Sequence, residues 1–180
     1  MGDINILNME SDLLVYGCMQ EDTERLVNLL LQDKYQHEMQ VIILDPCYKV
    51  PDCPDAPNLI LPPIRERYEL ETTLEWLQTI IQRRLDLLAS RREKYVDSFN
   101  EHFPEEKLPY ITVVATEAQD LEISRNDLLQ RILLNDDNAG VYLLALTEFF
   151  VEELDLGANN LMFNAMPFQD VINLIVGGSA

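Results

Sequence analysis

Five short, unbroken apolar runs, separated by helical patterns and polar loops, constrain the fold of this chain more than any other feature. Strands of a parallel sheet that is covered on both faces have this continuous apolar character, whereas half-exposed strands alternate. We therefore predict an α/β protein with a mainly parallel sheet sandwiched by helices, and leave the direction of the last strand open. The five runs are Leu13–Tyr16, Val41–Leu44, Tyr110–Ala115, Val141–Leu146 and Leu161–Ala165.

The segments between these runs have helical patterns. Apolar residues at three- and four-residue steps predict a helix over roughly 22–31 and a long helix over roughly 69–92. A short helical turn over 95–100, a helix that begins at Ser124 and a weaker helix that ends near Val176 complete the alternation. The arginines of the long helix lie off its apolar stripe, so we expect them on a solvated face. They are Arg83, Arg84, Arg91 and Arg92.

The composition and charge narrow the class of protein. At 180 residues the chain, 1–180, is predicted to be a single domain. It has 32 acidic and 13 basic residues and a formal net charge of −19, a field that repels nucleic acids and anionic membrane surfaces. No apolar run reaches the roughly 18–20 residues of a membrane span. Cys18, Cys47 and Cys53 lack metal-ligand spacing, which favours reduced thiols in the cytoplasm and leaves a structural zinc site as the alternative.

The stretch after the first apolar run has the layout of a phosphate-binding loop without its chemistry. A buried strand followed by a glycine, a loop and a helix is where nucleotide-binding proteins hold phosphates, using backbone N–H groups, a lysine and a hydroxyl. Here the loop has one glycine, no lysine and three carboxylates, which suit a helix N-terminus but repel a phosphate. The eight residues are Gly17, Cys18, Met19, Gln20, Glu21, Asp22, Thr23 and Glu24.

Two further strand ends carry polar pairs, Thr116-Glu117 and Thr147-Glu148. Sites in parallel α/β sheets lie at the carboxyl ends of strands, so we expect these pairs near the loop described above. One interpretation is an acid-lined site for Mg²⁺ or Ca²⁺ in a metal-dependent phosphohydrolase. The other is that the carboxylates are solvated loop residues. The residues concerned are Glu21, Asp22, Glu24, Glu117 and Glu148.

Several short motifs occur in the order seen in one family of motors. They are Asp45-Pro46 after the second run, Glu75-Trp76-Leu77 with Arg83-Arg84-Leu85 on the long helix, the turn 95–101, Leu108-Pro109-Tyr110-Ile111 and Ala139-Gly140-Val141. Together they resemble the FtsK/SpoIIIE-type RecA-like motor domains, which are DNA translocases related to the motors of type VII secretion and conjugation. The resemblance runs from about Leu13 to Gly178 and implies a RecA-like P-loop NTPase core.

The chain departs from that family's motifs at the residues that handle phosphate. Aligned with the family's Walker A motif, Thr23 stands for the phosphate-binding lysine and Glu24 for the metal-binding serine. Thr116 stands for the Walker B aspartate, although Glu117 matches the catalytic glutamate. In the sensor motif, Glu148 and Phe149 replace a glutamine and an arginine. Because phosphoryl transfer is catalysed mainly by such charges, the resemblance implies a pseudo-ATPase with degenerate motifs.

The function expected from this pattern is an interaction, structural or regulatory module of a translocase or secretion motor. Neither ATP nor Mg²⁺ is expected to bind, so no cofactor is predicted. The expected partner is a protein, either a neighbouring motor domain or a secretion substrate, and the expected location is the cytoplasm, as part of a membrane-anchored motor. The domain is expected to be excised from, or a partner of, a larger protein. The alternative is a residual ATP-binding and ATP-hydrolysing motor subunit for DNA or protein translocation.

An apolar segment after the fourth run is the predicted partner surface. Phe149 and Phe150 are adjacent, and neighbouring residues of a continuing strand point to opposite faces, so one ring is expected near solvent beside Leu154. The alternative is that the segment folds back and buries both rings.

Overall fold

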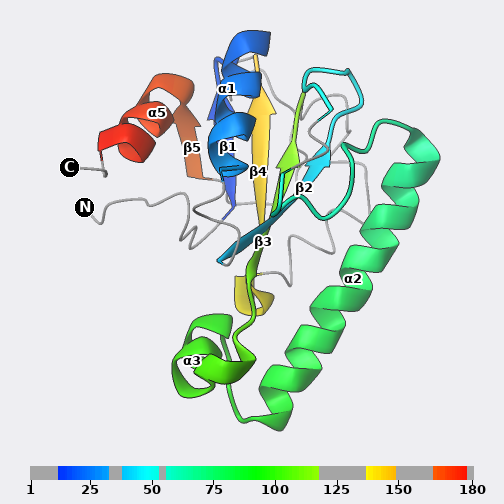
Figure 1. Cartoon of the computed structure of the whole chain (residues 1–180), viewed down its shortest axis with the longest axis vertical. Coiled ribbons are helices and arrows are strands. Elements are labelled where there is room, and N and C mark those ends of the chain that lie inside the picture. Colours follow the sequence, from blue (N-terminus) through cyan, green and yellow to red (C-terminus); the bar gives the residue numbers. More distant parts are fainter. Residues whose placement is uncertain (1–11, 33–37, 53–55, 118–136, 149–163, 178–180) are drawn as a thin grey trace.

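The computed structural model of the chain describes residues 12–32, 38–52, 56–117, 137–148 and 164–177. Figure 1 shows these residues as a sheet covered by helices, with one long helix running past its side. In chain order the elements are β1 (Leu13–Tyr16), α1 (Gln20–Leu30), β2 (Met39–Leu44), α2 (Arg67–Ser90), α3 (Val96–His102), η3 (Pro104–Glu106), β3 (Tyr110–Ala115), η4 (Asp137–Ala139), β4 (Val141–Thr147), β5 (Asn164–Pro167) and α5 (Phe168–Gly177).

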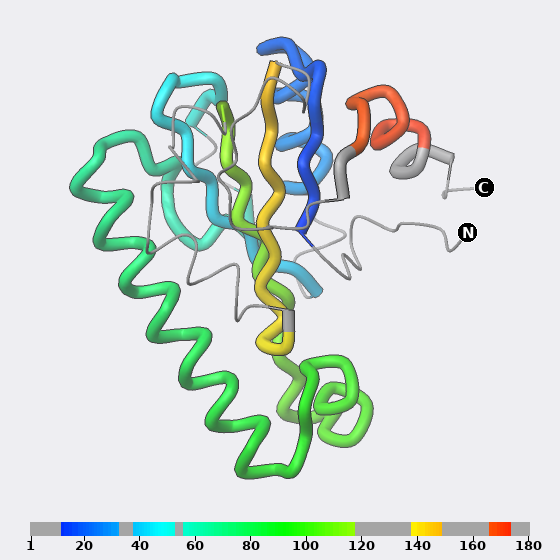
Figure 2. Tube along the Cα trace, turned by 180° about the vertical axis from the view of Figure 1, so that it is seen from behind, coloured from blue at the N-terminus to red at the C-terminus, as the bar shows by residue number. Residues whose placement is uncertain are grey.

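The sheet is parallel throughout, in the order β2-β3-β4-β1-β5. Seen from behind in Figure 2, β4 lies between β1 and β3. Leu13 of β1 lies opposite Leu144 of β4 on one side and Asn164 of β5 on the other. The last strand is therefore parallel to its neighbour, which resolves the direction that the sequence leaves open.

Successive strand residues point into two separate cores, as the pleat requires. Val41 and Ile43 of β2 pack on the face that carries α1 and α5, with the buried α1 residues Leu26, Val27 and Leu30. Ile42 and Leu44 pack on the opposite face, where α2 contributes its apolar stripe. The stripe residues in that core are Leu74, Leu77 and Ile81. The domain is thus a helix–sheet–helix sandwich, as predicted.

The strands and helices begin and end close to the positions predicted from the sequence, with small differences. β2 begins two residues earlier than expected, at Met39, and α1 begins two residues earlier, at Gln20. The final strand is Asn164–Pro167 rather than 161–165, and residues 161–163 lie outside the described part of the chain. The helix expected from Ser124 also lies outside it. Among the helices of the described residues, none has the length and apolar character to cross a membrane.

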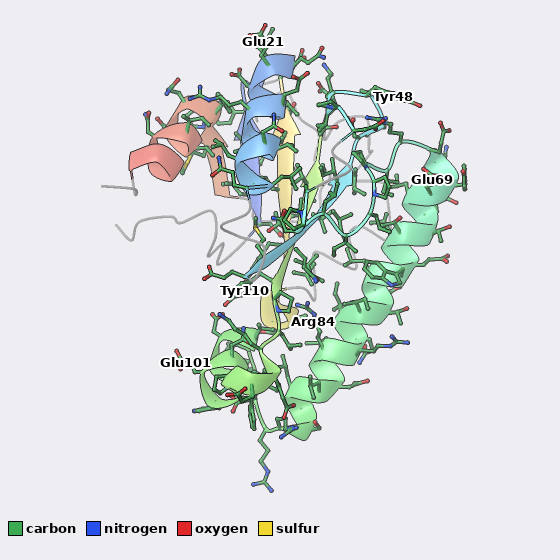
Figure 3. All side chains as sticks on the ribbon, in the orientation of Figure 1. Glu21, Tyr48, Glu69, Arg84, Glu101 and Tyr110 are labelled. Carbon is green, nitrogen blue, oxygen red and sulfur yellow. The ribbon has the colours of Figure 1, made fainter. Side chains whose placement is uncertain are left out.

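The basic residues of α2 do not share one solvated face, which corrects the expectation for Arg84. Its side chain is buried, and its Nη1 donates a hydrogen bond of 3.0 Å to the Ala139 carbonyl oxygen. In Figure 3, Arg84 points from α2 toward the start of β4. Burial lowers the pKa of this guanidinium to about 10. The helical period of α2 places Arg84 next to the apolar stripe, where β4 supplies an acceptor that the sequence of α2 does not reveal.

Candidate functional site

The carboxyl ends of β1, β2, β3 and β4 bring the predicted site residues to one edge of the sheet. Gly17 follows β1, Asp45 follows β2, Thr116 and Glu117 follow β3, and Glu148 follows β4. The Cys18 N–H donates to the Thr147 carbonyl oxygen at 2.9 Å, which ties the loop after β1 to the end of β4. This is the edge at which parallel α/β sheets bind ligands.

The loop after β1 is short, because α1 begins three residues after Gly17. Gly17 has a φ of +76°, a left-handed conformation that lets the strand turn sharply into the loop. The Met19 N–H then donates to the Asp22 carboxylate at 3.2 Å, and the Thr23 N–H donates to the Met19 carbonyl at 3.0 Å. The N–H groups of Cys18 and Met19 are therefore bonded within the protein rather than directed at a ligand.

The side chains of the first turn of α1 point in different directions. Thr23 is 3% exposed and faces the core, although the family alignment places it at the phosphate-binding lysine. Glu21 is exposed and lies at the outer tip of α1 in Figure 3. Glu24 is half-buried, and its carboxylate accepts a weak hydrogen bond of 3.4 Å from the Gln20 amide. No cationic side chain stands in this turn.

Cys18 is a buried thiol and not an exposed nucleophile. Its Sγ lies 3.8 Å from the Val15 carbonyl oxygen, and the side chain is 2% exposed. Burial, reinforced by the charge of Asp22, raises the pKa of the Cys18 thiol to about 12. Cys47 is exposed, and Cys53 lies outside the described residues. A buried thiol of this kind remains protonated at neutral pH.

Lys49 joins the two glutamates at the ends of β3 and β4. Its Nζ lies 2.8 Å from Glu117 Oε1 and 3.0 Å from Glu148 Oε1. The Lys49 side chain is 21% exposed, against 8% for Glu117 and 36% for Glu148. Its hydrogen bond to Glu117, and to a smaller extent its hydrogen bond to Glu148, raise the pKa of the Lys49 ammonium. Glu117 itself has a φ of +51°, a strained conformation for a residue other than glycine.

A second polar group beneath this bridge is centred on Asp45, which is fully buried. Its Oδ1 accepts hydrogen bonds from the Thr116 hydroxyl at 2.7 Å and the Lys49 N–H at 2.8 Å. Its Oδ2 accepts one from the Val50 N–H at 3.1 Å, and Arg65 Nε lies 3.6 Å away. The Thr116 hydroxyl, at the position aligned with the Walker B aspartate, is therefore directed toward the end of β2.

Sequence reasoning missed the parts that Lys49 and Asp45 play. In the sequence, Asp45 is noted only as part of the Asp45-Pro46 pair after the second run, and Lys49 belongs to no predicted motif. The available signal was a lone lysine just after a strand end, in a chain where carboxylates outnumber cations by more than two to one. Which strand ends would face that lysine depends on the strand order, and the loop sequence does not contain this information.

The acidic residues that the structure describes are not grouped as a metal centre. Among the residues that the structure describes, no three His, Cys, Asp or Glu side chains are grouped so that they could hold a metal ion. Glu117 and Glu148 do meet, but around the ammonium of Lys49, while Glu21, Asp22 and Glu24 belong to the first turns of α1. The interpretation of these five carboxylates as one cation site is not supported within that part of the chain. Phe149, Phe150 and Leu154, the predicted partner surface, lie outside it.

Comparison with known proteins identifies relatives among bacterial motors. The DNA translocase SftA of Bacillus subtilis is 30% identical over 120 residues, covering 62% of this chain and 13% of SftA. The DNA translocase FtsK of Staphylococcus epidermidis is 24% identical over 161 residues, covering 79% of this chain and 20% of FtsK. The chain therefore spans no more than a fifth of the length of these relatives. No family model matches the chain.

A solved structure shares the fold. The cytoplasmic domain of the type VII secretion ATPase EccC from Thermomonospora curvata superposes with a TM-score of 0.57 at 16% identity, covering 79% of this chain and 18% of that one. The parallel sheet and its flanking helices thus define a RecA-like P-loop ATPase fold. Within that class, the chain is similar in sequence to the DNA translocases SftA and FtsK, as expected for a relative of the FtsK/SpoIIIE-type P-loop motor domains.

Proposed function

We propose that this motor domain does not hydrolyse ATP and acts as an interaction or regulatory module within a larger translocase or secretion motor. The observation that carries the proposal is the loop after β1. At the positions where phosphates would bind, Thr23 is buried, the Met19 N–H is bonded to Asp22, and the first turn of α1 carries Glu21 and Asp22. A phosphate brought to this turn meets carboxylates in place of a lysine.

The charge balance of the loop opposes nucleotide binding. Phosphate sites at helix N-termini depend on free backbone N–H groups and on a positive local field. Here the Cys18 and Met19 N–H groups have partners within the protein, and the nearby carboxylates reverse the sign of the field. Each feature weakens nucleotide binding, and together they remove the interactions on which phosphoryl transfer depends.

The contacts of Lys49 with Glu117 and Glu148, at the ends of β3 and β4, support the same proposal. A catalytic glutamate must have an oxygen free to orient the attacking water, within about 3 Å. Glu117 is the residue aligned with that glutamate, and its Oε1 is held at 2.8 Å by the Lys49 ammonium. Thr116 directs its hydroxyl to Asp45 and brings no carboxylate to the metal shell. One oxygen of Glu117 is therefore engaged by Lys49, and a neutral hydroxyl stands at the position aligned with the acidic metal ligand.

The proposed partner is another protein, because a net charge of −19 disfavours nucleic acids as direct partners. We propose a neighbouring motor domain or a secretion substrate, in a cytoplasmic part of the motor. Phe149, Phe150 and Leu154 remain the predicted contact. Changing Phe149 and Phe150 singly to Ser tests this, since a contact residue loses partner binding without lowering Tm, whereas a core ring costs about 3–5 kcal/mol.

Isothermal titration with ATP and Mg²⁺ tests the nucleotide part of the proposal. We expect no binding tighter than a Kd of about 100 µM, or about −5.5 kcal/mol. Thermal unfolding gives an independent measure, because a nucleotide with that Kd at about 5 mM would stabilise the fold by about 2 kcal/mol. An intact FtsK-type motor domain serves as the positive control. A clear saturable isotherm below 100 µM contradicts the proposal.

The second candidate function is a residual ATPase, and one observation favours it. Glu117 still stands at the end of β3 and is buried at the edge where the family carries out hydrolysis. Phosphate release from ATP, measured for the wild type and for Glu117→Gln, decides between the two. Slow release that Glu117→Gln abolishes favours the residual ATPase. No release from either protein favours the inactive module.

A further inference from the structure

Exposed aromatic side chains gather where α2 begins. Among the described residues, five large apolar side chains are exposed, and three of them, Tyr48, Tyr68 and Trp76, belong to this region. They are 60%, 67% and 38% exposed. Tyr68 and Trp76 are eight residues apart on α2, so they lie roughly 80° apart around the helix axis, and both are exposed. The hydroxyl of Tyr48 lies 3.4 Å from the carboxylate of Glu66, the residue before α2, which places Tyr48 at the start of this helix.

Carboxylates surround these rings. Between residues 66 and 76 the chain has four of them, Glu66, Glu69, Glu71 and Glu75, and one cation, Arg67. Arg67 is 91% exposed and pairs with Glu71 at 3.4 Å, which is a weak surface contact. Figure 3 shows Tyr48 and Glu69 at the same corner of the molecule, on the loop after β2 and on the first turn of α2. The surface therefore combines broad aromatic faces with a net negative charge.

One arginine of the chain already makes the kind of contact that this surface offers. The guanidinium carbon of Arg65 lies 4.7 Å from the centre of the Tyr48 ring, while Nη1 of the same guanidinium contacts the Asp52 carboxylate at 2.8 Å. A planar guanidinium stacks on an aromatic face and also forms paired hydrogen bonds to a carboxylate, which an ammonium does less well. Tyr68, with Glu71 three residues further along α2 and Glu75 seven residues further, offers the same two kinds of contact to a group from outside.

We infer that the face formed by Tyr48, Tyr68 and Trp76 with Glu66, Glu71 and Glu75, the α2 aromatic face, binds an arginine-bearing segment of a partner protein. Exposed Tyr and Trp side chains are the residue types that dominate protein interfaces, and the carboxylates supply charge complementarity. A second copy of this chain is disfavoured as the occupant, because two copies each carry a net charge of −19. This inference goes beyond the proposed function and does not depend on the loss of ATP hydrolysis.

The test uses octa-arginine as the probe, with the whole chain at about 0.15 M salt. Trp76 is the only tryptophan in the chain, so its emission reports contact at this face. We expect the peptide to change Trp76 emission in a saturable way and to bind more tightly than octa-lysine, because only the guanidinium stacks as well as pairs. Equal affinity for the two peptides, or binding without a change in Trp76 emission, overturns the inference.

Variants that leave the net charge unchanged test whether peptide binding depends on the α2 aromatic face or only on the negative charge of the whole chain. We expect Tyr68→Ala to raise the Kd for octa-arginine about threefold or more. The matched control is Tyr95→Ala, an exposed tyrosine before α3 that is 45% exposed, and it should leave the Kd unchanged. Equal effects of the two changes overturn the inference. Tm measured for both variants shows that each is folded, as their exposure predicts.

A second pair of variants keeps the test valid if Tyr68→Ala is poorly folded. Glu71→Gln with Glu75→Gln removes two charges beside the rings, and Glu21→Gln with Glu24→Gln removes two charges on α1. Both double variants remove the same number of charges, so we expect the Glu71→Gln, Glu75→Gln variant to raise the Kd for octa-arginine more than the Glu21→Gln, Glu24→Gln variant does. Sedimentation without peptide completes the test. A dimer whose formation changes Trp76 emission would assign the face to a second copy and overturn the inference.

Discussion

The ammonium of Lys49 lies 2.8 Å from a carboxylate oxygen of Glu117. Lys49 belongs to the loop after β2 and Glu117 follows β3, so the two residues are 68 positions apart in the chain. The same ammonium reaches Glu148 after β4 at 3.0 Å. One side chain thus links the carboxyl ends of three consecutive strands of the sheet. We expect this link to contribute to the stability of the fold.

Replacing Lys49 by Met should destabilise the fold by about 1–3 kcal/mol, because it leaves the 8% exposed Glu117 carboxylate without this cation. Urea denaturation measures the change. The matched control is Arg67→Met, which removes a solvent-exposed pair with Glu71 and should cost less than about 0.5 kcal/mol. Equal losses in the two variants would show that the Lys49 bridge behaves as an ordinary surface pair.

The pH dependence of the Lys49 effect follows from the direction of its pKa. The pKa of Lys49 is raised above its ordinary value of 10.5, so its contribution is complete below that value and is lost only as pH rises through the raised pKa. The difference in unfolding free energy between the wild type and Lys49→Met should therefore be the same at pH 7 and pH 9. A difference that shrinks over this range would contradict the assignment.

Cys18 should resist alkylation in the native protein while Cys47 reacts. Cys18 is 2% exposed, and burial raises its pKa to about 12, so almost no thiolate forms at pH 8. Cys47 is exposed. Iodoacetamide treatment at pH 8 followed by peptide mass mapping measures each site separately, and a sample unfolded in urea shows that both thiols are competent. Labelling of native Cys18 at the rate of Cys47 would contradict its burial.

Gly140→Ala should cost more stability than Gly17→Ala, although both glycines have a left-handed φ, +66° and +76°. A Cβ at Gly140 would lie 3.1–3.2 Å from side-chain atoms of Val96, whereas one at Gly17 meets nothing within 4 Å. We expect about 1–2 kcal/mol for Gly17→Ala from backbone strain and about 1–3 kcal/mol more for Gly140→Ala.

A double-mutant cycle separates the steric part of that cost. In a Val96→Ala background the penalty of Gly140→Ala should fall in part, because the two Val96 methyl groups are removed while the Val96 Cβ at 3.2 Å remains. An unchanged penalty would assign the whole effect to the backbone conformation.

Arg84→Ala should destabilise the protein by about 2–4 kcal/mol, because it leaves a void and removes the donor to the Ala139 carbonyl oxygen. The control is Arg83→Ala, one position away on the exposed side of α2, which should change stability by less than about 0.5 kcal/mol. Thermal unfolding of the two variants measures the contrast. Similar values would mean that the guanidinium of Arg84 is solvated.

The sequence alone determined the layers of this protein, since each strand and helix has a local pattern. The runs 13–16 and 110–115 match β1 and β3 residue for residue, and the long helix was placed to within two residues at each end. Such patterns depend on residues two to four positions apart, which the chain carries whatever its tertiary structure. The order of short motifs from Leu13 onward also carries the resemblance to the motor family, in agreement with the DNA translocases found as relatives.

Only the tertiary structure decided which side chains meet at the carboxyl edge. Lys49 lies 99 residues from Glu148, and they come together because β2, β3 and β4 are consecutive in the sheet. Arg84 was predicted to face solvent, and it is buried because the start of β4 lies beside α2 and offers the Ala139 carbonyl oxygen. The direction of β5 likewise depends on its pairing with β1. Strand order arises from packing between distant segments, and no local pattern encodes those neighbours.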